Sequence, residues 1–383
     1  MRVLVATTAG EGHFGPLIPF TAGCRDIGHD VVVAAPQSFA TSVKRAGFAY
    51  QALADTPAEE LGAIFDSLRG LSTDEANARV VADIFAGVNV RAALPGMRDL
   101  IDAWSPDVIL RESVEFASYL AAERAGVPQV EVAIGLTRVR ERVISWAEPR
   151  MTELRASVGL PPDPGFARYR SSLLLSLLPP TFDDSPDGRP LVRRFRADSP
   201  AAPPPELPDW WPDSDDPFVY VTFGSVAAGA GWFPDFYRAV VDALADLPVR
   251  ILLTLGRGTE PSALEPLPRN VHVEKWWPQE AVMPYAAALV GHGGVGTTLS
   301  GLAAGVPMVV TPLFADQPYN AERVEAVGVG VAVKGGAAGV HALGGAVEEV
   351  LSRPAYRERA AEIAAEIRSL PPVADAMPHL RRP

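Results

Sequence analysis

The chain of 383 residues is longer than a single hydrophobic core usually supports, so two domains are expected. A composition of 48 % hydrophobic and 21 % charged residues is typical of globular proteins and excludes a disordered chain. A formal net charge of −12, without any basic run, argues against nucleic acid as a partner.

Three features bear on the compartment. Cys24 is the only cysteine and has no mate for a disulfide, which favours a reducing environment. The N-terminal MRVLVATTAG lacks the apolar stretch and cleavage site of a signal peptide. The longest apolar run, residues 302–314, contains Gly305, Pro307 and Pro312 and is shorter than the roughly 20 residues of a membrane span. We therefore expect a cytoplasmic protein without a membrane span.

The first half alternates buried-strand patterns with helical patterns. Such alternation with short links predicts a parallel sheet covered by helices. The predicted strands are 2–7, 30–35, 107–111 and 129–134, and the predicted helices are 16–27 and 113–125.

A change in amino-acid composition separates the two halves. The segment from about 195 to 217 is rich in Pro and Asp and cannot form a helix interior or a central strand, which predicts a linker. Alternation then resumes, and a final amphipathic helix begins at Pro354. The cleft between two similar α/β halves is the default ligand site. The predicted strands of the second half are 218–223, 249–254, 287–290 and 307–311, and its helices are 232–244, 296–304, 316–327 and 342–351.

Two loops match G-x-G-x-x-G, one in each half: residues 10–15 (GEGHFG) and 291–296 (GHGGVG). Such a loop lets the backbone approach an anion at a helix start, and it suits nicotinamide, flavin and other diphosphates alike. A dinucleotide site also needs an acid about 20 residues further on, at a strand tip. The first loop has none, and Asp316 follows the second but stands outside the predicted strand. An NAD-type oxidoreductase remains an alternative.

Four separated motifs then narrow the choice: Trp276-Trp277-Pro278-Gln279, the run from His292 to Thr298, Gly305-Val306-Pro307, and Asp316-Gln317. This ordered set resembles the donor-binding signature of nucleotide-sugar glycosyltransferases, and the whole chain is most similar to the bacterial antibiotic and deoxysugar enzymes. The resemblance implies the α/β GT-B fold, two Rossmann-like domains with parallel sheets that face each other across a cleft. It assigns residues 1–200 to acceptor binding, 201–217 to the linker, 218–360 to the nucleotide sugar, and 361–383 to a tail that crosses back to the first domain.

The resemblance also assigns donor contacts. Trp276 would stack on the nucleobase, Gln279 would bond the base edge, and His292 with the helix start would meet the diphosphate. Three residues of the predicted donor set have a structural alternative to donor binding. Trp277 could pack in the core, Ser225 could stabilise a turn, and Asp316 could cap the following helix. The full predicted donor set is Ser225, Trp276, Trp277, Gln279, His292, Gly293, Gly294, Gly296, Thr297, Thr298, Asp316 and Gln317.

The catalytic prediction rests on His13. An imidazole can remove the proton of an attacking hydroxyl near neutral pH. By family likeness a carboxylate orients this histidine, and the candidate is Glu112, with Glu115 as the alternative. The implied mechanism is a single displacement with inversion.

No metal or other cofactor is expected, because the helix start beyond His292 can stabilise the leaving nucleotide. The six histidines show no metal-ligand spacing, and we interpret Asp213-Ser214-Asp215 as a solvated acidic turn.

The substrates are less defined. Ser300 stands where relatives using UDP-glucose carry a ribose-binding Glu, which favours a dTDP-deoxysugar over a UDP-sugar. The segments around 55–100 and 135–175, with Phe65, Phe85, Trp146 and Phe166, are expected to line the site of a small-molecule aglycone. The oligomeric state, monomer or homodimer, stays open. A non-catalytic auxiliary relative of these enzymes also stays open as an alternative function.

Overall fold

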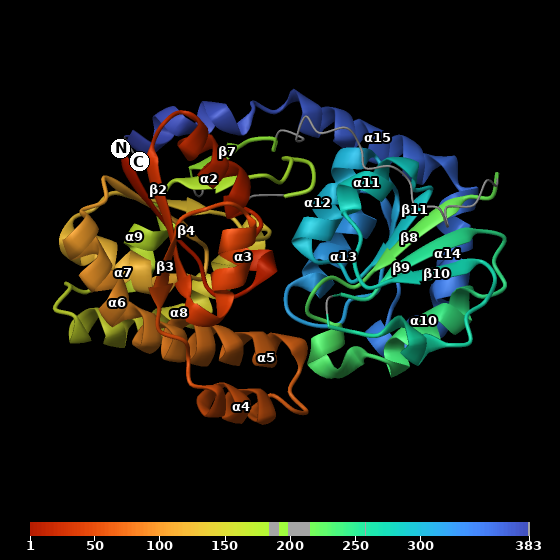
Figure 1. Cartoon of the computed structure of the whole chain (residues 1–383), viewed down its shortest axis with the longest axis horizontal. Helices are drawn as coiled ribbons and strands as arrows, with labels where there is room; N and C mark the ends of the chain where they lie inside the picture. The colour runs from red at the N-terminus through yellow and green to blue at the C-terminus, as the bar shows by residue number, and fades with distance from the viewer. Residues whose placement is uncertain (184–190, 198–214, 257, 382–383) are drawn as a thin grey trace. The chain divides into compact units, whose positions relative to one another are not determined.

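The computed structural model describes residues 1–183, 191–197, 215–256 and 258–381. It divides into two compact units (Figure 1). Unit 1 comprises Met1–Asp198 with Leu370–Pro383, and unit 2 comprises Ser199–Ser369. The predicted linker, 201–217, lies outside the described residues except for its last three positions.

Unit 1 is built on a seven-stranded sheet in the order β3-β2-β1-β4-β5-β6-β7. Every neighbouring pair is parallel, as the alternation of strands and helices predicts. Strand order reverses between β1 and β4, and ligands of such sheets bind at the carboxyl ends of the strands beside this point. The strands are β1 (Arg2–Ala6), β2 (Asp30–Pro36), β3 (Tyr50–Leu53), β4 (Val108–Glu112), β5 (Gln129–Val132), β6 (Leu174–Ser176) and β7 (Val192–Arg194).

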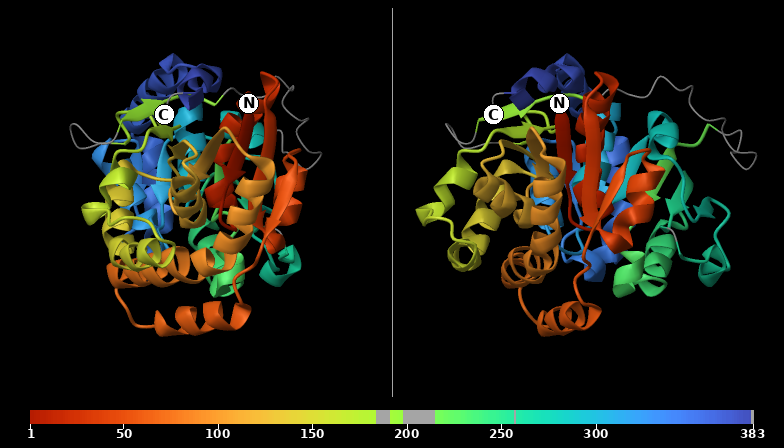
Figure 2. Two further views of the ribbon diagram at one scale, coloured as in Figure 1. Left: turned by 90° about the vertical axis from the view of Figure 1, so that its left-hand side faces the viewer. Right: turned by 60° about the vertical axis from the view of Figure 1, so that its left-hand side comes forward.

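The helices of unit 1 cover this sheet and add an arm. Helix α4 packs on η2 rather than on the sheet, and none of its residues is fully buried (Figures 1 and 2). The helices are α1 (Glu11–Phe14), α2 (Leu17–Asp26), η1 (Gln37–Phe39), α3 (Ala40–Arg45), α4 (Ala58–Ser67), α5 (Thr73–Arg79), η2 (Val80–Val88), α6 (Asn89–Trp104), α7 (Phe116–Ala125), α8 (Thr137–Ser157), η3 (Pro164–Phe166), α9 (Ala167–Arg170) and η8 (Val373–Arg381).

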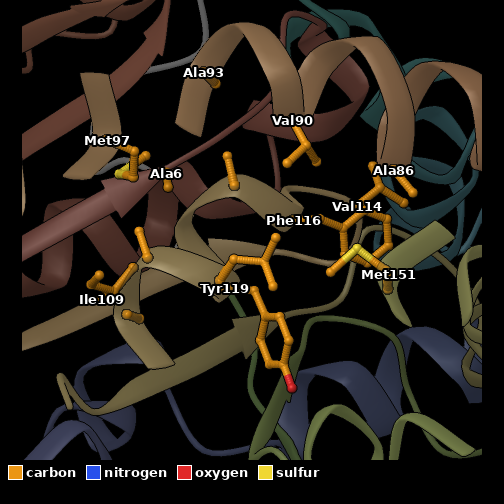
Figure 3. Packing of buried hydrophobic residues seen from close by; sticks show 14 of the residues in the cluster. Ala6, Ala86, Val90, Ala93, Met97, Ile109, Val114, Phe116, Tyr119 and Met151 are labelled. Carbon is orange, nitrogen blue, oxygen red and sulfur yellow. The ribbon is translucent and has the colours of Figure 1, made fainter. Parts of the chain in front are cut away.

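The core of unit 1 lies between the sheet and α6, α7 and α8. Met97, Ile109, Phe116 and Met151 are buried together in it (Figure 3). Burial of each such side chain contributes about 1.5–3 kcal/mol to the free energy of unfolding.

One helical stretch of the described chain, Thr73–Trp104, is long and apolar enough to cross a membrane by length and composition. It comprises α5, η2 and α6, and its apolar side supplies Val81, Val90 and Met97 to the core cluster. In this structure it is therefore a core helix of unit 1.

Unit 2 repeats the topology of unit 1 with a six-stranded sheet in the order β10-β9-β8-β11-β12-β13. All five pairs are parallel, and the order reverses between β8 and β11. The strands are β8 (Phe218–Thr222), β9 (Arg250–Thr254), β10 (Val271–Glu274), β11 (Ala288–Gly291), β12 (Met308–Val310) and β13 (Gly330–Ala332). The helices are η4 (Ala228–Trp232), α10 (Asp235–Leu244), η5 (Pro261–Leu264), α11 (Gln279–Val282), η6 (Met283–Tyr285), α12 (Val295–Ala304), α13 (Gln317–Ala326), η7 (Gly336–Ala342), α14 (Leu343–Ser352) and α15 (Pro354–Ser369).

The C-terminal segment changes units at residue 370, whereas the sequence places that boundary at 361. Helix α15 packs on α12 and lies wholly within unit 2. The tail after it belongs to unit 1, where η8 packs on α2 and Met377 contacts Cys24.

Candidate active site

His13 and Glu112 meet at the point in unit 1 where strand order reverses. Glu112 is the last residue of β4, and His13 lies on α1, which follows the neighbouring β1. His13 Nδ1 is 3.2 Å from Glu112 Oε1. The Glu112 side chain is completely buried, while 24 % of the His13 side chain is exposed. The pair thus joins a fixed carboxylate to an imidazole that solvent or a ligand can reach.

The Glu112 carboxylate is held on both oxygens. Oε1 accepts hydrogen bonds from the Thr8 hydroxyl at 2.9 Å and from the Thr8 amide at 3.3 Å. Oε2 accepts one from the Val114 amide at 2.6 Å. Because these donors fix the carboxylate, its contact with His13 also fixes the orientation of the imidazole.

Glu115, the alternative carboxylate, has a different place. It caps α7, with Oε2 accepting from the Ser118 amide at 2.8 Å, so the helix predicted from 113 begins at Phe116. Burial raises the pKa of Glu115 to about 7; hydrogen bonds from Ser118 act in the opposite direction, and the charge of Glu112 adds to the rise.

The raised pKa of Glu115 predicts a pH-dependent stability. Between its ordinary pKa of 4.5 and about 7 the folded state binds more protons than the unfolded state, so stability falls as pH rises through this window. The whole loss is on the order of 3 kcal/mol. Glu115→Gln still accepts from Ser118 but cannot ionise, so it should remove the loss. Thermal midpoints of both proteins from pH 5 to 8 test this. Parallel curves for the two proteins would contradict the prediction.

A pocket lies beside the His13–Glu112 pair. Thr8 and Phe85 line it, and Phe85 also contacts His13, with ring centroids 5.3 Å apart. Phe85 lies in the π-helical stretch η2, and such stretches are common at functional sites. Its full lining is Thr7, Thr8, Pro36, Leu53, Ala54, Thr56, Phe85, Asn89, Val90, Ala93, Val114, Glu115, Phe116 and Ala117.

The four aromatic residues expected around an acceptor separate in the structure. Only Phe85 lines the pocket. Phe166 is buried in the core, Trp146 packs against that core, and Phe65 is exposed on α4. The expectation is therefore wrong for Phe166, because its ring is enclosed by Phe116, Tyr119 and Tyr169.

The glycine loop of unit 2 lies where β8 and β11 end. His292 follows β11, and its imidazole lies between two glycines: a Cβ at Gly224 would come within 2.9 Å of the ring and one at Gly294 within 2.5 Å. A side chain at either position would therefore clash with the imidazole ring. Burial lowers the pKa of His292 to about 4, with a smaller opposite effect of a hydrogen bond to the Thr222 backbone. The imidazole is neutral at pH 7.

The helix start beyond this loop gathers polar groups. Gly294 is the N-cap of α12, and the side chains of Thr297 and Thr298 are buried in its first turn. Gln279 Nε2 donates to Thr297 Oγ1 at 3.3 Å, which ties α11 to α12. The structure thus brings Gln279 next to the loop and helix start from His292 to Thr298, as the prediction requires.

The two tryptophans differ in exposure. Half of the surface of Trp276 is exposed after the end of β10, as a stacking face requires. Trp277 is half-buried. Ser225 is exposed after β8, at the same edge of the sheet.

Asp316 and Gln317 lie beside the glycine loop at the start of α13. Asp316 makes no capping hydrogen bond with its side chain; instead Oδ2 accepts from Asn320 Nδ2 at 2.9 Å. Asn320 also donates to the Gly293 carbonyl oxygen at 2.8 Å, so it links the two motifs. The side-chain oxygen of Gln317 accepts from the Leu313 and Phe314 amides. Sequence reasoning missed Asn320, although its place one helical turn after Asp316 could have shown it.

Within the described ranges no group of three or more His, Cys, Asp and Glu residues could hold a metal ion. Of the Asp213-Ser214-Asp215 motif, the first two positions lie outside those ranges.

Comparison with known proteins decides the family. The family described as "UDP-glucoronosyl and UDP-glucosyl transferase" matches residues 202–373, and "Erythromycin biosynthesis protein CIII-like, N-terminal domain" matches residues 23–162. Elloramycin glycosyltransferase ElmGT of Streptomyces olivaceus is 30 % identical, over 99 % of this chain and 97 % of that protein. The chain belongs to the bacterial natural-product glycosyltransferases. 4'-Demethylrebeccamycin synthase of Lentzea aerocolonigenes is 29 % identical, over 98 % of both chains.

Solved structures agree on the fold of this glycosyltransferase. SnogD from Streptomyces nogalater superposes with a TM-score of 0.78 at 26 % identity, over 99 % of both chains. VinC, solved in complex with dTDP, gives 0.75 at 21 % identity, over 100 % of this chain and 99 % of that one. The fold is GT-B, as the sequence motifs imply, and the protein is a transferase that acts on natural products.

Proposed function

We propose that this glycosyltransferase transfers a deoxysugar from a dTDP-sugar to a hydroxyl group of a small-molecule aglycone, with inversion at the anomeric carbon. The observation that carries the proposal is the contact between His13 and the fixed carboxylate of Glu112 beside the pocket. A histidine held by a carboxylate in this way can act as a general base that removes the proton of a substrate group.

The proposed chemistry follows from the two ring nitrogens of His13. With its hydrogen on Nδ1, the imidazole donates to Glu112 and leaves Nε2 as the proton acceptor. Nε2 takes the acceptor's hydroxyl proton while the hydroxyl oxygen bonds to the anomeric carbon. The bond from that carbon to the diphosphate oxygen breaks, and dTDP leaves with the bonding electrons. Glu112 stabilises the imidazolium that results.

The pocket next to Phe85 suits one apolar end of the acceptor. Its wall combines Leu53, Val90 and Phe116 with a few polar groups. Thr56 donates to Asn89 Oδ1 at 2.8 Å, so these polar groups have a fixed orientation. We propose that unit 1 binds the aglycone here, as the family resemblance implies.

Unit 2 is proposed to bind the nucleotide sugar. Trp276 offers an exposed face for the base, and the amides at the start of α12 face the diphosphate. Thr297, Thr298 and the neutral His292 complete that end, and we propose that Asp316, whose carboxylate accepts a hydrogen bond from the buried Asn320, meets sugar hydroxyls. The helix dipole of α12 stabilises the departing dTDP, so we propose no metal and no cofactor besides the donor.

Two observations support dTDP over UDP. The Ser300 hydroxyl donates to the Gly296 carbonyl oxygen at 3.0 Å, and no carboxylate occupies this position to grip a ribose 2′-hydroxyl. VinC, of the same fold, was solved with dTDP.

Nucleotide binding tests the proposal. Wild-type protein should be stabilised in a thermal-shift titration by dTDP more strongly than by UDP, and not by NAD. Trp276→Ala should weaken dTDP binding by about 5- to 150-fold, because stacking on an aromatic ring contributes about 1–3 kcal/mol. Tyr285→Ala is the matched control, an exposed aromatic ring ahead of β11 at the opposite edge of the sheet. Tighter binding of UDP would reverse the donor assignment, and stabilisation by NAD alone would overturn the function.

A further inference from the structure

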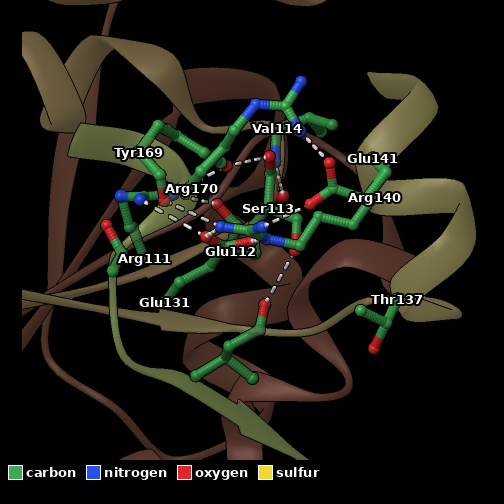
Figure 4. A network of polar contacts seen from close by, with 12 residues as sticks. Arg111, Glu112, Ser113, Val114, Glu131, Thr137, Arg140, Glu141, Tyr169 and Arg170 are labelled. Carbon is green, nitrogen blue, oxygen red and sulfur yellow. Dashed lines mark hydrogen bonds and ion pairs between the residues drawn. The ribbon is translucent and has the colours of Figure 1, made fainter. Parts of the chain in front are cut away.

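A buried ionic cluster lies directly behind Glu112. Arg111, Glu131 and Arg140 have side chains that are 0–3 % exposed (Figure 4). Arg140 binds Glu131 with two hydrogen bonds, Nε to Oε1 at 2.7 Å and Nη2 to Oε2 at 2.8 Å. Arg111 Nη2 is 3.5 Å from Glu131 Oε2. The cluster joins the ends of β4 and β5 to α8.

Tyr169 of α9 lies at the centre of the cluster. Both guanidinium groups face its ring, with Arg111 4.2 Å and Arg140 5.1 Å from the ring centroid. The hydroxyl accepts from Arg111 Nη1 at 2.9 Å and donates to the Ser113 carbonyl oxygen. The Tyr169 carbonyl oxygen accepts from Arg140 Nη2 at 2.8 Å. Ring, hydroxyl and backbone of one residue are therefore all fixed by the two arginines.

Stability gives little reason for such a cluster. Removing several ions from water costs about as much as their mutual attraction returns, and apolar residues of similar volume often stabilise a core better. Its position suggests another role. Ser113 stands between Glu112 and Val114, the residue whose amide holds Glu112 Oε2. Arg111 Nη1 also donates to the Glu112 carbonyl oxygen at 3.5 Å.

We infer that Tyr169 is a positioning residue for the reaction: through the Ser113 carbonyl it fixes the backbone from Glu112 to Val114, and through Glu112 it orients His13. The inference rests on the proposed function, because it assigns Tyr169 to the same His13–Glu112 pair. It goes beyond that function by extending the pair to α9, more than fifty residues further along the chain.

The test begins with Tyr169→Phe, which removes only the hydroxyl. We expect kcat to fall roughly tenfold, since small misplacements of a catalytic group cost one to two orders of magnitude. The KM values for donor and acceptor should stay within twofold. Tyr237→Phe is the matched control, because Tyr237 is also buried and its hydroxyl also donates to a backbone carbonyl, that of Leu255. The control should lose thermal stability without losing kcat.

A double-mutant cycle with Glu112→Gln separates positioning from general loosening of the fold. If Tyr169 acts through Glu112, Tyr169→Phe should change kcat less than twofold in the Glu112→Gln background. An equal loss in both backgrounds would show a structural role and overturn the inference. Unchanged kcat of Tyr169→Phe in wild type would also overturn it, while the proposed function stands as long as Glu112→Gln and His13→Ala lose activity. Full activity of those two variants would instead overturn the proposed function.

Discussion

Replacement of His13 by alanine should lower kcat for transfer to a hydroxyl acceptor by about 10²- to 10⁴-fold, the range that general bases contribute. The variant removes the imidazole that lies 3.2 Å from the Glu112 carboxylate and that the proposal assigns as the general base. It removes no group of unit 2, so the affinity for dTDP should stay within twofold. Steady-state kinetics with saturating donor and a separate dTDP titration measure the two quantities.

His341→Ala serves as the control for His13→Ala. His341 is an exposed histidine of η7 in unit 2, with a single hydrogen bond to the Ala338 carbonyl oxygen. Its loss should change neither kcat nor dTDP affinity. Preserved turnover in His13→Ala would rule out the base assignment. If neither wild type nor variant transfers sugar while both bind dTDP, the chain is the non-catalytic auxiliary relative.

The sequence predicts the centres of both sheets and misses their edges. Strands β1, β2, β8 and β11 are near-continuous apolar runs because helices cover both faces of a parallel sheet. The strands without a prediction are short or polar. In β3 (YQAL) two of the four residues are exposed, and β6 and β13 have three residues each. Three residues give no measurable period. β12 also has three residues, and it could be predicted because it lies in the apolar run 307–311.

The helices in the arm of unit 1 could not be predicted from the sequence pattern either. The segment 55–100 carries α4, α5, η2 and most of α6, and the π-helical stretch η2 separates α5 from α6. A π-helical stretch changes the helical period, because each of its turns contains extra residues. The same stretch aims Phe85 at His13, which no spacing argument could foresee.

The candidate site divides in the same way. Motifs made of neighbouring residues, such as the run from His292 to Thr298, could be located because a strand–loop–helix unit fixes their geometry locally. Contacts between distant segments could not, apart from the His13–Glu112 pair that the family resemblance implies. Asn320 reaches Gly293 across 27 residues, and Tyr169 reaches Ser113 across more than fifty. Such pairs depend on how the helices pack against the sheet, and a single sequence gives no information on that packing.

Gly294→Ala should weaken dTDP binding about tenfold or more through a single added methyl group. The backbone of Gly294, at φ −62° and ψ 137°, suits any residue, so the substitution causes no backbone strain. The new Cβ would lie 2.5 Å from His292 Nε2 and 2.9 Å from its Cε1, so the imidazole must move. Loss of one hydrogen bond to a charged phosphate costs about 1.5–3 kcal/mol, which corresponds to tenfold or more in affinity.

Gly296→Ala provides the matched control in the same loop. Nothing lies within 4 Å of a Cβ at Gly296, which belongs to the first turn of α12. Alanine there should raise the thermal midpoint slightly, because it favours the helix over the unfolded chain. Calorimetric titration with dTDP should give wild-type affinity for this variant. A similar loss in both variants would show that the loop tolerates no side chain at all, and that His292 is not the reason.

A second background separates displacement of His292 from direct obstruction of the diphosphate. If the methyl group acts by moving the imidazole, Gly294→Ala should have little further effect on dTDP affinity once His292 is already alanine. If the methyl group itself meets the phosphate, the loss should persist in the His292→Ala background, where the ring no longer occupies the space beside Gly294. In the first case the two glycines at 224 and 294 serve to seat a neutral histidine at the donor site, and the conformation of His292, rather than its charge, controls how tightly the nucleotide binds.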